Sequence, residues 1–287
     1  MTGRRRLAGA WLAALLLLPC LLAASASAQE PVSLPGTRQI SFMAGPANDR
    51  EYRLLVSEPA GKRVPRAGHP VLFVLDGNAH FAAFHDARRA QSAFAEAIVV
   101  GIGYPTTLPH DFLRRSYDFS PAVTPERNSP PQGGDDELLG TLERVIAELG
   151  QRYPIDPQQL SLFGHSFGGM FAMHALFTRP ALFSHYVAAS PSLWWNDHYL
   201  LAQEQAFARR VESGDWSPRH QSLLLIVGER ETPQDIQELE ALERRLQPLS
   251  RWGLRTARHL QPDEDHMSLP ASIAPRVLRQ VFTARRR

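Results

Sequence analysis

The stretch Leu160-Ser-Leu-Phe-Gly-His-Ser-Phe-Gly-Gly-Met170 decides how the rest of the chain is interpreted. It consists of a short apolar run, one serine between glycines, and then the apolar start of a helix at 171–177. The segment from Gly164 to Gly168 fits the Gly-x-Ser-x-Gly pattern, in which a nucleophilic serine occupies a sharp turn between strand and helix. Glycines suit that turn because strand and helix cross too closely there for Cβ atoms. The stretch therefore predicts Ser166 as a nucleophile at a helix N-terminus, where N–H groups favour negative charge.

An ordinary glycine-rich turn is the alternative, because this short pattern arises by chance in roughly one chain in ten of this length. Short apolar runs recur along the chain and alternate with helical patterns. We expect strands at 38–43, 52–57, 70–75, 97–103, from Leu160 into the serine turn, and at 186–189, 222–227 and 255–260. We expect helices at 135–149, from the serine turn to Pro180, and at 200–211, 233–246 and 271–282.

This alternation predicts an α/β protein with a mostly parallel central sheet covered by helices on both faces. The first two strands are bounded by turn residues and predict an antiparallel N-terminal hairpin at a sheet edge. With the serine turn in place, the pattern favours the α/β-hydrolase fold.

The N-terminus has the composition of an export signal. Three arginines, Arg4 to Arg6, precede an apolar run that ends in Ala26-Ser27-Ala28. A positive head, an apolar centre and an A-x-A exit predict a secretory signal peptide at 1–28 and a single catalytic domain at 29–287. A membrane anchor is the alternative, although the run is near the lower length limit for a span. We expect a periplasmic or secreted bacterial protein with no stable membrane association after cleavage.

Charge and cysteine content exclude several functions. Cleavage removes three arginines and no acids, so the formal net charge falls from +2 to −1 and leaves no basic field for nucleic acid. Cys20 is the only cysteine and lies in the predicted signal peptide, which excludes a cysteine nucleophile or a zinc-thiolate site from the mature domain. No metal and no organic cofactor is implied, and the sequence predicts no oligomeric state.

A serine nucleophile needs a base, usually an imidazole oriented by a carboxylate, and in this fold the chain order is serine, acid, histidine. His266 lies in the loop between the last expected strand and the last expected helix, where a base can reach back over the sheet. His165 lies inside the serine turn and is expected to point away from the nucleophile, while His174 and His259 fall within a helix and a strand. His266 is the predicted base, with a solvated loop histidine as the alternative.

The acid is predicted in the segment Gly228-Glu229-Arg230-Glu231, just past the carboxyl end of a strand. Glu231 fits the position best and Glu229 is the alternative. Both carboxylates could instead pair with Arg230, which would leave a Ser–His dyad or an acid from elsewhere. Asp235 fits better as a helix-capping residue.

The oxyanion hole needs backbone donors aimed at the tetrahedral intermediate. One is the N–H of Phe167, next after the serine. The other is expected in Asp76-Gly77-Asn78, from the N–H of Asn78 with Gly77 as second choice, although this tripeptide also fits a simple tight turn. Residues 104–131 show little periodicity and form either a fixed wall or a mobile lid.

Six stretches together resemble the α/β-hydrolase esterases that include esterase D, and within them the periplasmic trilactone siderophore esterases. The stretches are Leu75–Phe81, Arg115–Pro121, Gly133–Gly134, Leu162–Gly169, Ser190–Trp195 and Asp265–Ser268. The resemblance covers nearly all of the mature chain. It implies hydrolysis of small-molecule esters, namely ferric trilactone siderophores such as enterobactin or salmochelin, in iron acquisition.

The resemblance also implies that Arg115, with Arg114 beside it, meets the substrate. A guanidinium suits an anionic ferric catecholate with flat faces. Trp194 and Trp195 either line the opening of the same substrate site or lie in the core. An alternative function is hydrolysis or transfer of other acyl groups, including feruloyl and acetyl esters of carbohydrates. An alternative of another class is a non-catalytic ligand-binding protein on a hydrolase scaffold.

Overall fold

Eight strands form one sheet in the unit that begins at Leu34. The structure is a computed structural model that describes residues 32–61 and 63–283. The predicted signal peptide at 1–28 therefore lies outside the described residues. The strands are β1 (Thr37–Ala44), β2 (Arg50–Ser57), β3 (His69–Val74), β4 (Ile98–Gly103), β5 (Ile155–His165), β6 (His185–Ala189), β7 (Ser222–Gly228) and β8 (Arg255–Gln261).

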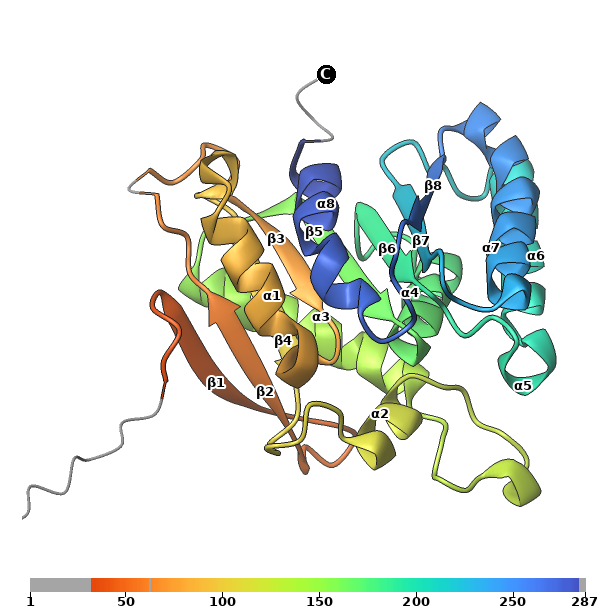
Figure 1. The fold of residues 1–287 in the computed structure, drawn as a ribbon, viewed down its shortest axis with the longest axis horizontal. Coiled ribbons are helices and arrows are strands. Elements are labelled where there is room, and N and C mark those ends of the chain that lie inside the picture. The colour runs from red at the N-terminus through yellow and green to blue at the C-terminus, as the bar shows by residue number, and fades with distance from the viewer. Residues whose placement is uncertain (1–31, 62, 284–287) are drawn as a thin grey trace, which may run out of the picture. The chain divides into compact units, whose positions relative to one another are not determined.

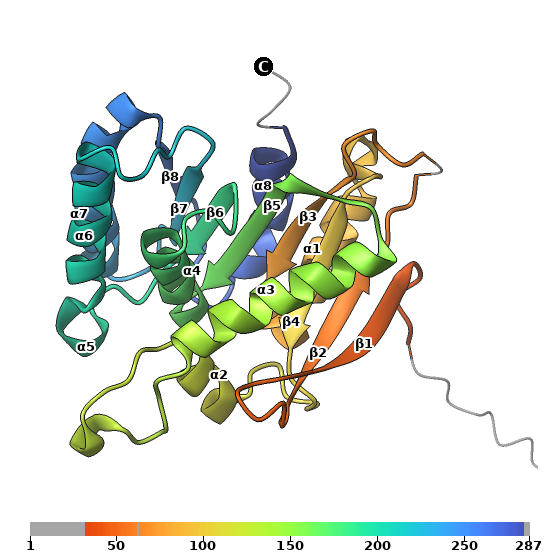
Figure 2. The same ribbon diagram turned by 180° about the vertical axis from the view of Figure 1, so that it is seen from behind.

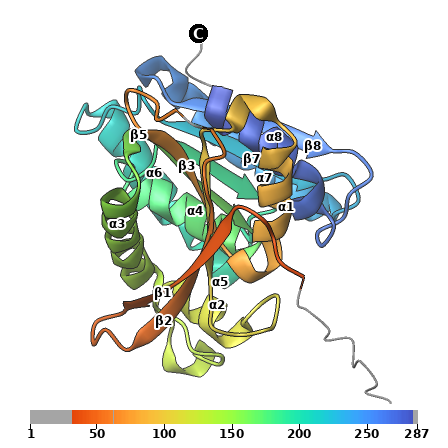
Figure 3. The ribbon, with the colours of Figure 1, turned by 90° about the vertical axis from the view of Figure 1, so that its left-hand side faces the viewer.

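The sheet order is β1-β2-β4-β3-β5-β6-β7-β8. The first two pairings, β1 with β2 and β2 with β4, are antiparallel, and all the others are parallel. The hairpin thus occupies one edge of a mostly parallel sheet, which confirms the predicted α/β-hydrolase architecture. Figure 3 shows α3 on one side of this sheet and α1 on the other.

The helices are α1 (Gly77–Arg89), α2 (Phe112–Asp118), α3 (Asp135–Arg152), α4 (Phe167–Thr178), α5 (Trp195–His198), α6 (Leu200–Glu212), α7 (Pro233–Leu246) and α8 (Leu269–Thr283). Short 3₁₀ turns lie at Ser92–Phe94, Pro125–Arg127 and Gln247–Trp252. Helices α1 and α8 cover the face seen in Figure 1, and α3, α4 and α6 cover the reverse face in Figure 2. Among the described residues, no helix combines the length and apolar character that a membrane crossing needs.

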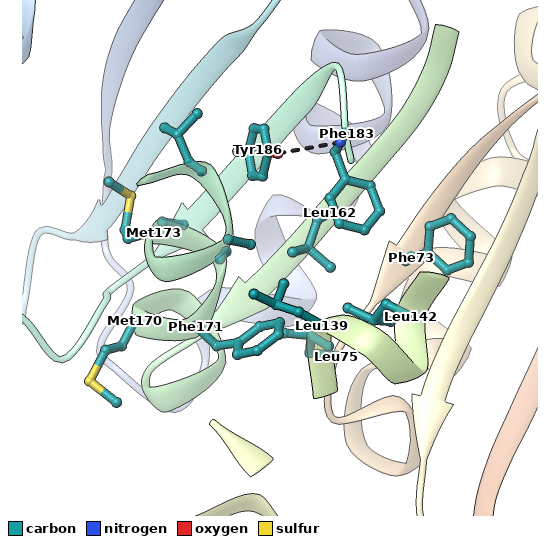
Figure 4. Packing of buried hydrophobic residues seen from close by; sticks show 14 of the residues in the cluster. Phe73, Leu75, Leu139, Leu142, Leu162, Met170, Phe171, Met173, Phe183 and Tyr186 are labelled. Carbon is teal, nitrogen blue, oxygen red and sulfur yellow. Dashed lines mark hydrogen bonds between the residues drawn. The ribbon is translucent and has the colours of Figure 1, made fainter. Parts of the chain in front are cut away.

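Two apolar cores follow from the alternation of side chains along the central strands. In β3, Val71 and Phe73 pack beneath α3 and α4, whereas Leu72 and Val74 pack beneath α1 and α8. A strand buried on both faces must be apolar throughout, which explains the continuous runs in the sequence. Figure 4 shows the larger core, where Phe171 of α4 lies near Leu139 of α3.

All the expected strands and helices are present with bounds shifted by a few residues. Three helices were not expected: α1 directly after the Asp76 loop, α2 inside the 104–131 segment, and the short α5 that begins at Trp195. Helix α7 begins as the capping pattern predicts, because the hydroxyl of Thr232 accepts from the N–H of Asp235 at 3.2 Å.

Candidate active site

Ser166 lies on the sharp turn between the end of β5 and the start of α4. Its backbone has φ 58° and ψ −120°, a region that non-glycine residues rarely occupy and that often marks a functional site. The turn is held by main-chain bonds, since the N–H of Ser166 donates to the carbonyl of Ala189 at 2.9 Å. The hydroxyl of Ser166 is thereby presented at the carboxyl edge of the parallel strands.

The glycines of this turn are required by close backbone approach. A Cβ on Gly164 would lie 1.9 Å from the carbonyl oxygen of Gly168, and one on Gly169 would lie 2.9 Å from the carbonyl oxygen of Ala189. Real Cβ atoms do not approach a backbone oxygen so closely. Strand β5 and helix α4 can therefore cross at Ser166 only when glycines stand at these positions.

His266 and Glu231 come together from adjacent loops. The Nδ1 atom of His266 lies 3.0 Å from the Oε2 atom of Glu231, within hydrogen-bond distance. The two loops follow β7 and β8, which are neighbours in the sheet, and the N–H of Arg230 joins them by donating to the carbonyl of Glu264 at 2.9 Å. The carboxylate side chain is 2% exposed and the imidazole 42% exposed. The imidazole thus has one side held by a buried acid and its other side toward solvent.

Glu231 has two further donors at its Oε1 atom. The hydroxyl of Ser190 donates to it, and so does the N–H of Gly228 at 2.9 Å. Burial raises the pKa of Glu231, but the hydrogen bonds from His266, Ser190 and Gly228 outweigh burial, so the net shift is downward. The carboxylate is therefore ionised at neutral pH and keeps the proton of His266 on Nδ1.

Glu229 and Asp235, the other acids considered for this role, have partners other than His266. Glu229 accepts from the N–H of Asp263 at 3.1 Å, and Arg230 pairs with Asp263 at 2.8 Å. Asp235 lies at the start of α7, where its carboxylate accepts from the hydroxyl of Thr232. Of the three acids, only Glu231 contacts the imidazole in this structure.

A cleft of about 420 Å³ contains both the serine and the imidazole. Its polar lining includes Ser166, Arg115, Arg230, Glu231 and His266. Its apolar lining includes Phe112, Phe167, Trp194 and Met267, three of which are at least half exposed. The cleft thus combines a serine, a base and cations with flat apolar faces.

Arg115 reaches the cleft from α2 and is fixed by a buried carboxylate. Its Nε and Nη2 atoms donate to the two oxygens of Asp76 at 3.1 and 3.0 Å. Burial raises the pKa of Asp76, but His110 and Arg115 together hold it well below its usual range. A bidentate pair of this kind fixes the guanidinium plane.

Arg114 does not share that position, and the prediction that it meets the substrate beside Arg115 is not supported. Its guanidinium lies over the rings of Tyr52 and Tyr104, 4.9 Å from each centroid, and donates to the carbonyl of Glu51 at 3.2 Å. Consecutive helical residues point about 100° apart, which lets Arg115 face the cleft while Arg114 packs on Tyr52 and Tyr104.

The two neighbouring tryptophans also differ in burial and in position. Trp194 is 50% exposed and lines the cleft, whereas Trp195 is 9% exposed and packs against Phe167 with ring centroids 6.0 Å apart. Trp195 therefore supports the wall of the cleft from the core and does not form its surface.

The predicted oxyanion donors lie at two helix N-termini, where N–H groups lack intrahelical acceptors. Phe167 is the first residue of α4 and Asn78 the second of α1. The side chain of Asn78 has a separate task, because its Oδ1 accepts from the N–H of Tyr104 at 2.8 Å and its Nδ2 donates to the carbonyl of Thr106 at 3.0 Å. The oxyanion role of both N–H groups stays a prediction.

These contacts favour a fixed wall over a mobile lid for the first part of the 104–131 segment. Its start is held by Asn78, α2 is held by the Arg115 pair, and Phe119 is 1% exposed against Phe171 of α4. The absence of helical periodicity in the sequence had left this open.

Two buried histidines, His165 and His80, lie beside His266, and the sequence had given His80 no role. The ring of His165 lies 4.6 Å from the ring of His266 and 5.7 Å from that of His80. Burial lowers the pKa of His165 well below its usual value and that of His80 to about 4. His165 therefore packs as a neutral ring against the imidazole of His266, a contact that was not expected. The stretch Asn78-Ala-His80-Phe gave no periodic signal for this placement.

Comparisons with known proteins agree with this geometry. The family model described as "Putative esterase" matches residues 46–267. The ferri-bacillibactin esterase BesA of Bacillus subtilis strain 168 is 31% identical over 264 residues, which cover 86% of this chain and 90% of that protein. The siderophore triacetylfusarinine C esterase of Aspergillus fumigatus is 39% identical over 202 residues, covering 66% of this chain and 67% of that protein.

Solved structures show the same fold. The BES protein from Bacillus cereus superposes with a TM-score of 0.80 at 30% identity, covering 88% of this chain and 97% of that chain. The siderophore hydrolase EstB from Aspergillus nidulans superposes with a TM-score of 0.68 at 27% identity, covering 90% and 99%. The chain therefore belongs to this esterase family, and it is an enzyme that hydrolyses carboxylic ester bonds.

Proposed function

We propose that the protein is an exported serine esterase that cleaves the ester bonds of siderophores, with ferric trilactones as its substrates. The observation that carries the proposal is the bond between His266 and buried Glu231 in a cleft that also holds Ser166 and Arg115. The names of the relatives support the substrate class, because they include esterases of ferri-bacillibactin, enterobactin and apo-salmochelin.

In the proposed reaction, the hydroxyl oxygen of Ser166 attacks the ester carbonyl and its proton moves to Nε2 of His266. Glu231 stabilises the imidazolium through Nδ1 without itself taking the proton. The N–H groups of Phe167 and Asn78 stabilise the oxyanion. The imidazolium then protonates the leaving alcohol oxygen, which leaves an acyl-serine.

Water completes the cycle. His266 removes one proton from the attacking water, which adds to the acyl carbonyl, and the same proton returns to Ser166 as the acid product leaves. No external oxidant, reductant or cofactor enters this balance. The steps are an ordinary two-stage acyl transfer to water.

Part of the cleft lining suits a large substrate with flat rings and anionic groups, beside the carboxylates of Glu231, Asp235 and Asp265 that also line the cleft. Arg115 supplies a fixed positive charge, and Phe112 and Trp194 supply exposed aromatic faces. A guanidinium prefers planar, delocalised anions such as metal-bound catecholates. The proposed export from the bacterial cytoplasm, based on residues 1–28, suits an enzyme that meets siderophores in the periplasm or outside the cell.

The substrate test is a product analysis with apo- and ferric enterobactin beside a methyl ferulate and an acetylated sugar. We expect linear and monomeric fragments from the trilactone and slow turnover of the other esters. Fast turnover of a feruloyl or acetyl ester without trilactone cleavage would contradict the siderophore proposal and favour the alternative esterase function.

The serine mechanism is tested separately with Ser166→Ala and p-nitrophenyl butyrate. Loss of the nucleophile should lower kcat by about a million-fold, as loss of the nucleophilic serine does in a serine protease. Ser192→Ala, which removes another hydroxyl from the cleft lining, is the matched control and should retain activity. Equal rates for Ser166→Ala and wild type would rule out the proposed nucleophile. N-terminal sequencing of the protein recovered from the periplasm or medium should begin at Gln29.

A further inference from the structure

A second group of ionisable side chains lies away from the cleft, where α3 and α6 pack against α4. Figure 2 shows the start of α3 beside α4 on the reverse face of the sheet. His174 of α4 is 3% exposed, and Asp135 and Asp136 belong to the first turn of α3. One ligand atom from each of the three residues lies within 4.8 Å of the others.

The ring of His174 is held between α6 and the start of α3. Its Nδ1 atom lies 3.0 Å from the amide oxygen of Gln203 and 3.5 Å from Oδ2 of Asp135. Its Nε2 atom lies 3.4 Å from Oδ1 of Asp136. When Nδ1–H donates to Gln203 in the neutral ring, Nε2 has the lone pair that a cation would bind.

Three buried polar atoms in the described part of this region make no hydrogen bond, although two of them lie within ion-pair distance of a neighbour. Among the described residues, Nε2 of His174, Oδ2 of Asp135 and the hydroxyl of Tyr199 are buried and make no hydrogen bond. Buried polar atoms are normally satisfied, and a cation bound between the imidazole and the two carboxylates would give Nε2 of His174 and Oδ2 of Asp135 a partner.

We propose that His174, Asp135 and Asp136 bind a divalent transition-metal cation such as Zn²⁺. The donor set is one imidazole nitrogen and two carboxylate oxygens, which suits Zn²⁺ better than the all-oxygen preference of Mg²⁺ or Ca²⁺. Ligands about 2.1 Å from a tetrahedral metal lie roughly 3.4 Å apart, which matches the spacing between His174 and Asp136.

Two further features fit such a site. A metal-bound histidine usually donates its other N–H to an acceptor that fixes the ring, and Gln203 occupies that position. The side chain of Asp136 is 75% exposed, which gives the cation an entry path from solvent. The cation would join α3 to the helix that carries the serine turn.

The site is separate from the catalytic cleft. His174 follows Ser166 by eight residues, which is about 12 Å along a helix at 1.5 Å per residue. The cation therefore has a structural task and does not touch the reacting atoms. Removing it should lower the melting temperature and leave kcat/KM for p-nitrophenyl butyrate unchanged well below the melting range.

The test is a titration of chelator-treated, tag-free enzyme with Co²⁺, whose visible absorbance reports bound ligands, followed by competition with Zn²⁺. We expect one site per chain. Asp136→Asn removes an exposed ligand without disturbing the core and should weaken binding at least 100-fold, whereas Gln203→Ala should weaken it 10- to 100-fold. Asp86→Asn is the matched control, because that carboxylate is 63% exposed on α1, on the other face of the sheet.

His266→Gln distinguishes this site from the catalytic imidazole and should keep the cobalt band. Retained binding in that variant and weakened binding in Asp136→Asn would support the proposal even if His174 variants fail to fold. Binding of equal strength in Asp136→Asn and wild type, loss of the band in His266→Gln, or the absence of any band would overturn it.

Discussion

Arg115 and Asp76 meet in two parallel hydrogen bonds, from Nε to Oδ1 at 3.1 Å and from Nη2 to Oδ2 at 3.0 Å. The carboxylate side chain is 1% exposed and the guanidinium 12% exposed. The pair joins the loop after β3 to helix α2. The guanidinium of Arg115, which faces the cleft, therefore also holds the wall of the cleft together. Breaking this pair should affect both stability and the shape of the site.

Asp76→Asn tests the energy of the pair. Asp76 has φ 50°, which asparagine tolerates, so the substitution removes charge and keeps the backbone. We expect the free energy of unfolding, measured with urea, to fall by about 3–5 kcal/mol, because the guanidinium is left buried without its partner. Asp263→Asn is the matched control, since it also has positive φ and pairs with an arginine but is 82% exposed. It should cost at most about 1 kcal/mol. Equal losses would contradict the role of burial.

Glu231→Gln tests the proposed acid. The amide keeps the shape of the side chain but loses the charge that stabilises an imidazolium on His266. We expect kcat with p-nitrophenyl butyrate to fall by orders of magnitude, up to about 10⁴-fold. Glu229→Gln changes an acid in the same loop that does not contact the imidazole and should leave kcat near the wild-type value. An unchanged kcat in Glu231→Gln would favour a Ser–His dyad.

Gly164→Ala tests the crossing of β5 and α4. Its Cβ would lie 1.9 Å from the carbonyl oxygen of Gly168, so either the turn at Ser166 shifts or the protein fails to fold. We expect loss of soluble, active enzyme. Gly140→Ala is the control, because no atom lies within 4 Å of the added Cβ on α3, and it should stabilise the protein by about 0.5–1 kcal/mol. Wild-type kcat and melting temperature in Gly164→Ala would show that the turn is less constrained than the structure indicates.

The buried histidines predict how stability depends on pH. Burial lowers the pKa of His80 to about 4 in the folded state, against 6.5 for an exposed imidazole, so the unfolded chain binds more protons between these values. Stability is therefore full above pH 6.5 and falls with pH down to about 4, by on the order of 3 kcal/mol from this residue. His165 acts in the same direction.

Urea unfolding of His80→Gln between pH 4 and 7 checks this expectation and should give a shallower slope than wild type. His198→Gln, which removes a half-exposed imidazole, is the matched control and should keep the wild-type slope. Parallel curves for His80→Gln and wild type would show that His80 is not the group that titrates.

The sequence predicts the serine, the imidazole and its acid partner because each lies in the turn or loop that follows an expected strand. Parallel strands end at one edge of a sheet, so Ser166, Glu231 and His266 were expected close together although 100 residues separate the first from the last. The same reasoning cannot tell which side chains of α2 face the cleft, because that helix was not expected from the sequence. The family resemblance puts Arg115 first and Arg114 beside it, and the packing of Arg114 on Tyr52 and Tyr104 is what keeps the second arginine away from the cleft.

The sequence also does not predict which side chains are buried by elements that are distant along the chain. His165 was expected to point away from the nucleophile, and its contact with the ring of His266 was not foreseen, because the β5 turn and the β8 loop meet only in the folded chain. Trp194 and Trp195 are likewise neighbours in the sequence, and contacts with Phe167 bury one of them. The missing signal in each case is a contact between residues that are far apart in sequence.

The main-chain bond between Arg230 and Glu264 has a consequence for how this enzyme can diversify. The separation of the proposed acid and base is set by backbone pairing of two loops, so an insertion or deletion in either loop would misplace both groups. Substitutions at Phe112, Trp194 and Met267, which are exposed at the mouth of the cleft, leave that pairing intact. Laboratory evolution toward new esters should therefore proceed by exchanging these side chains at constant loop length.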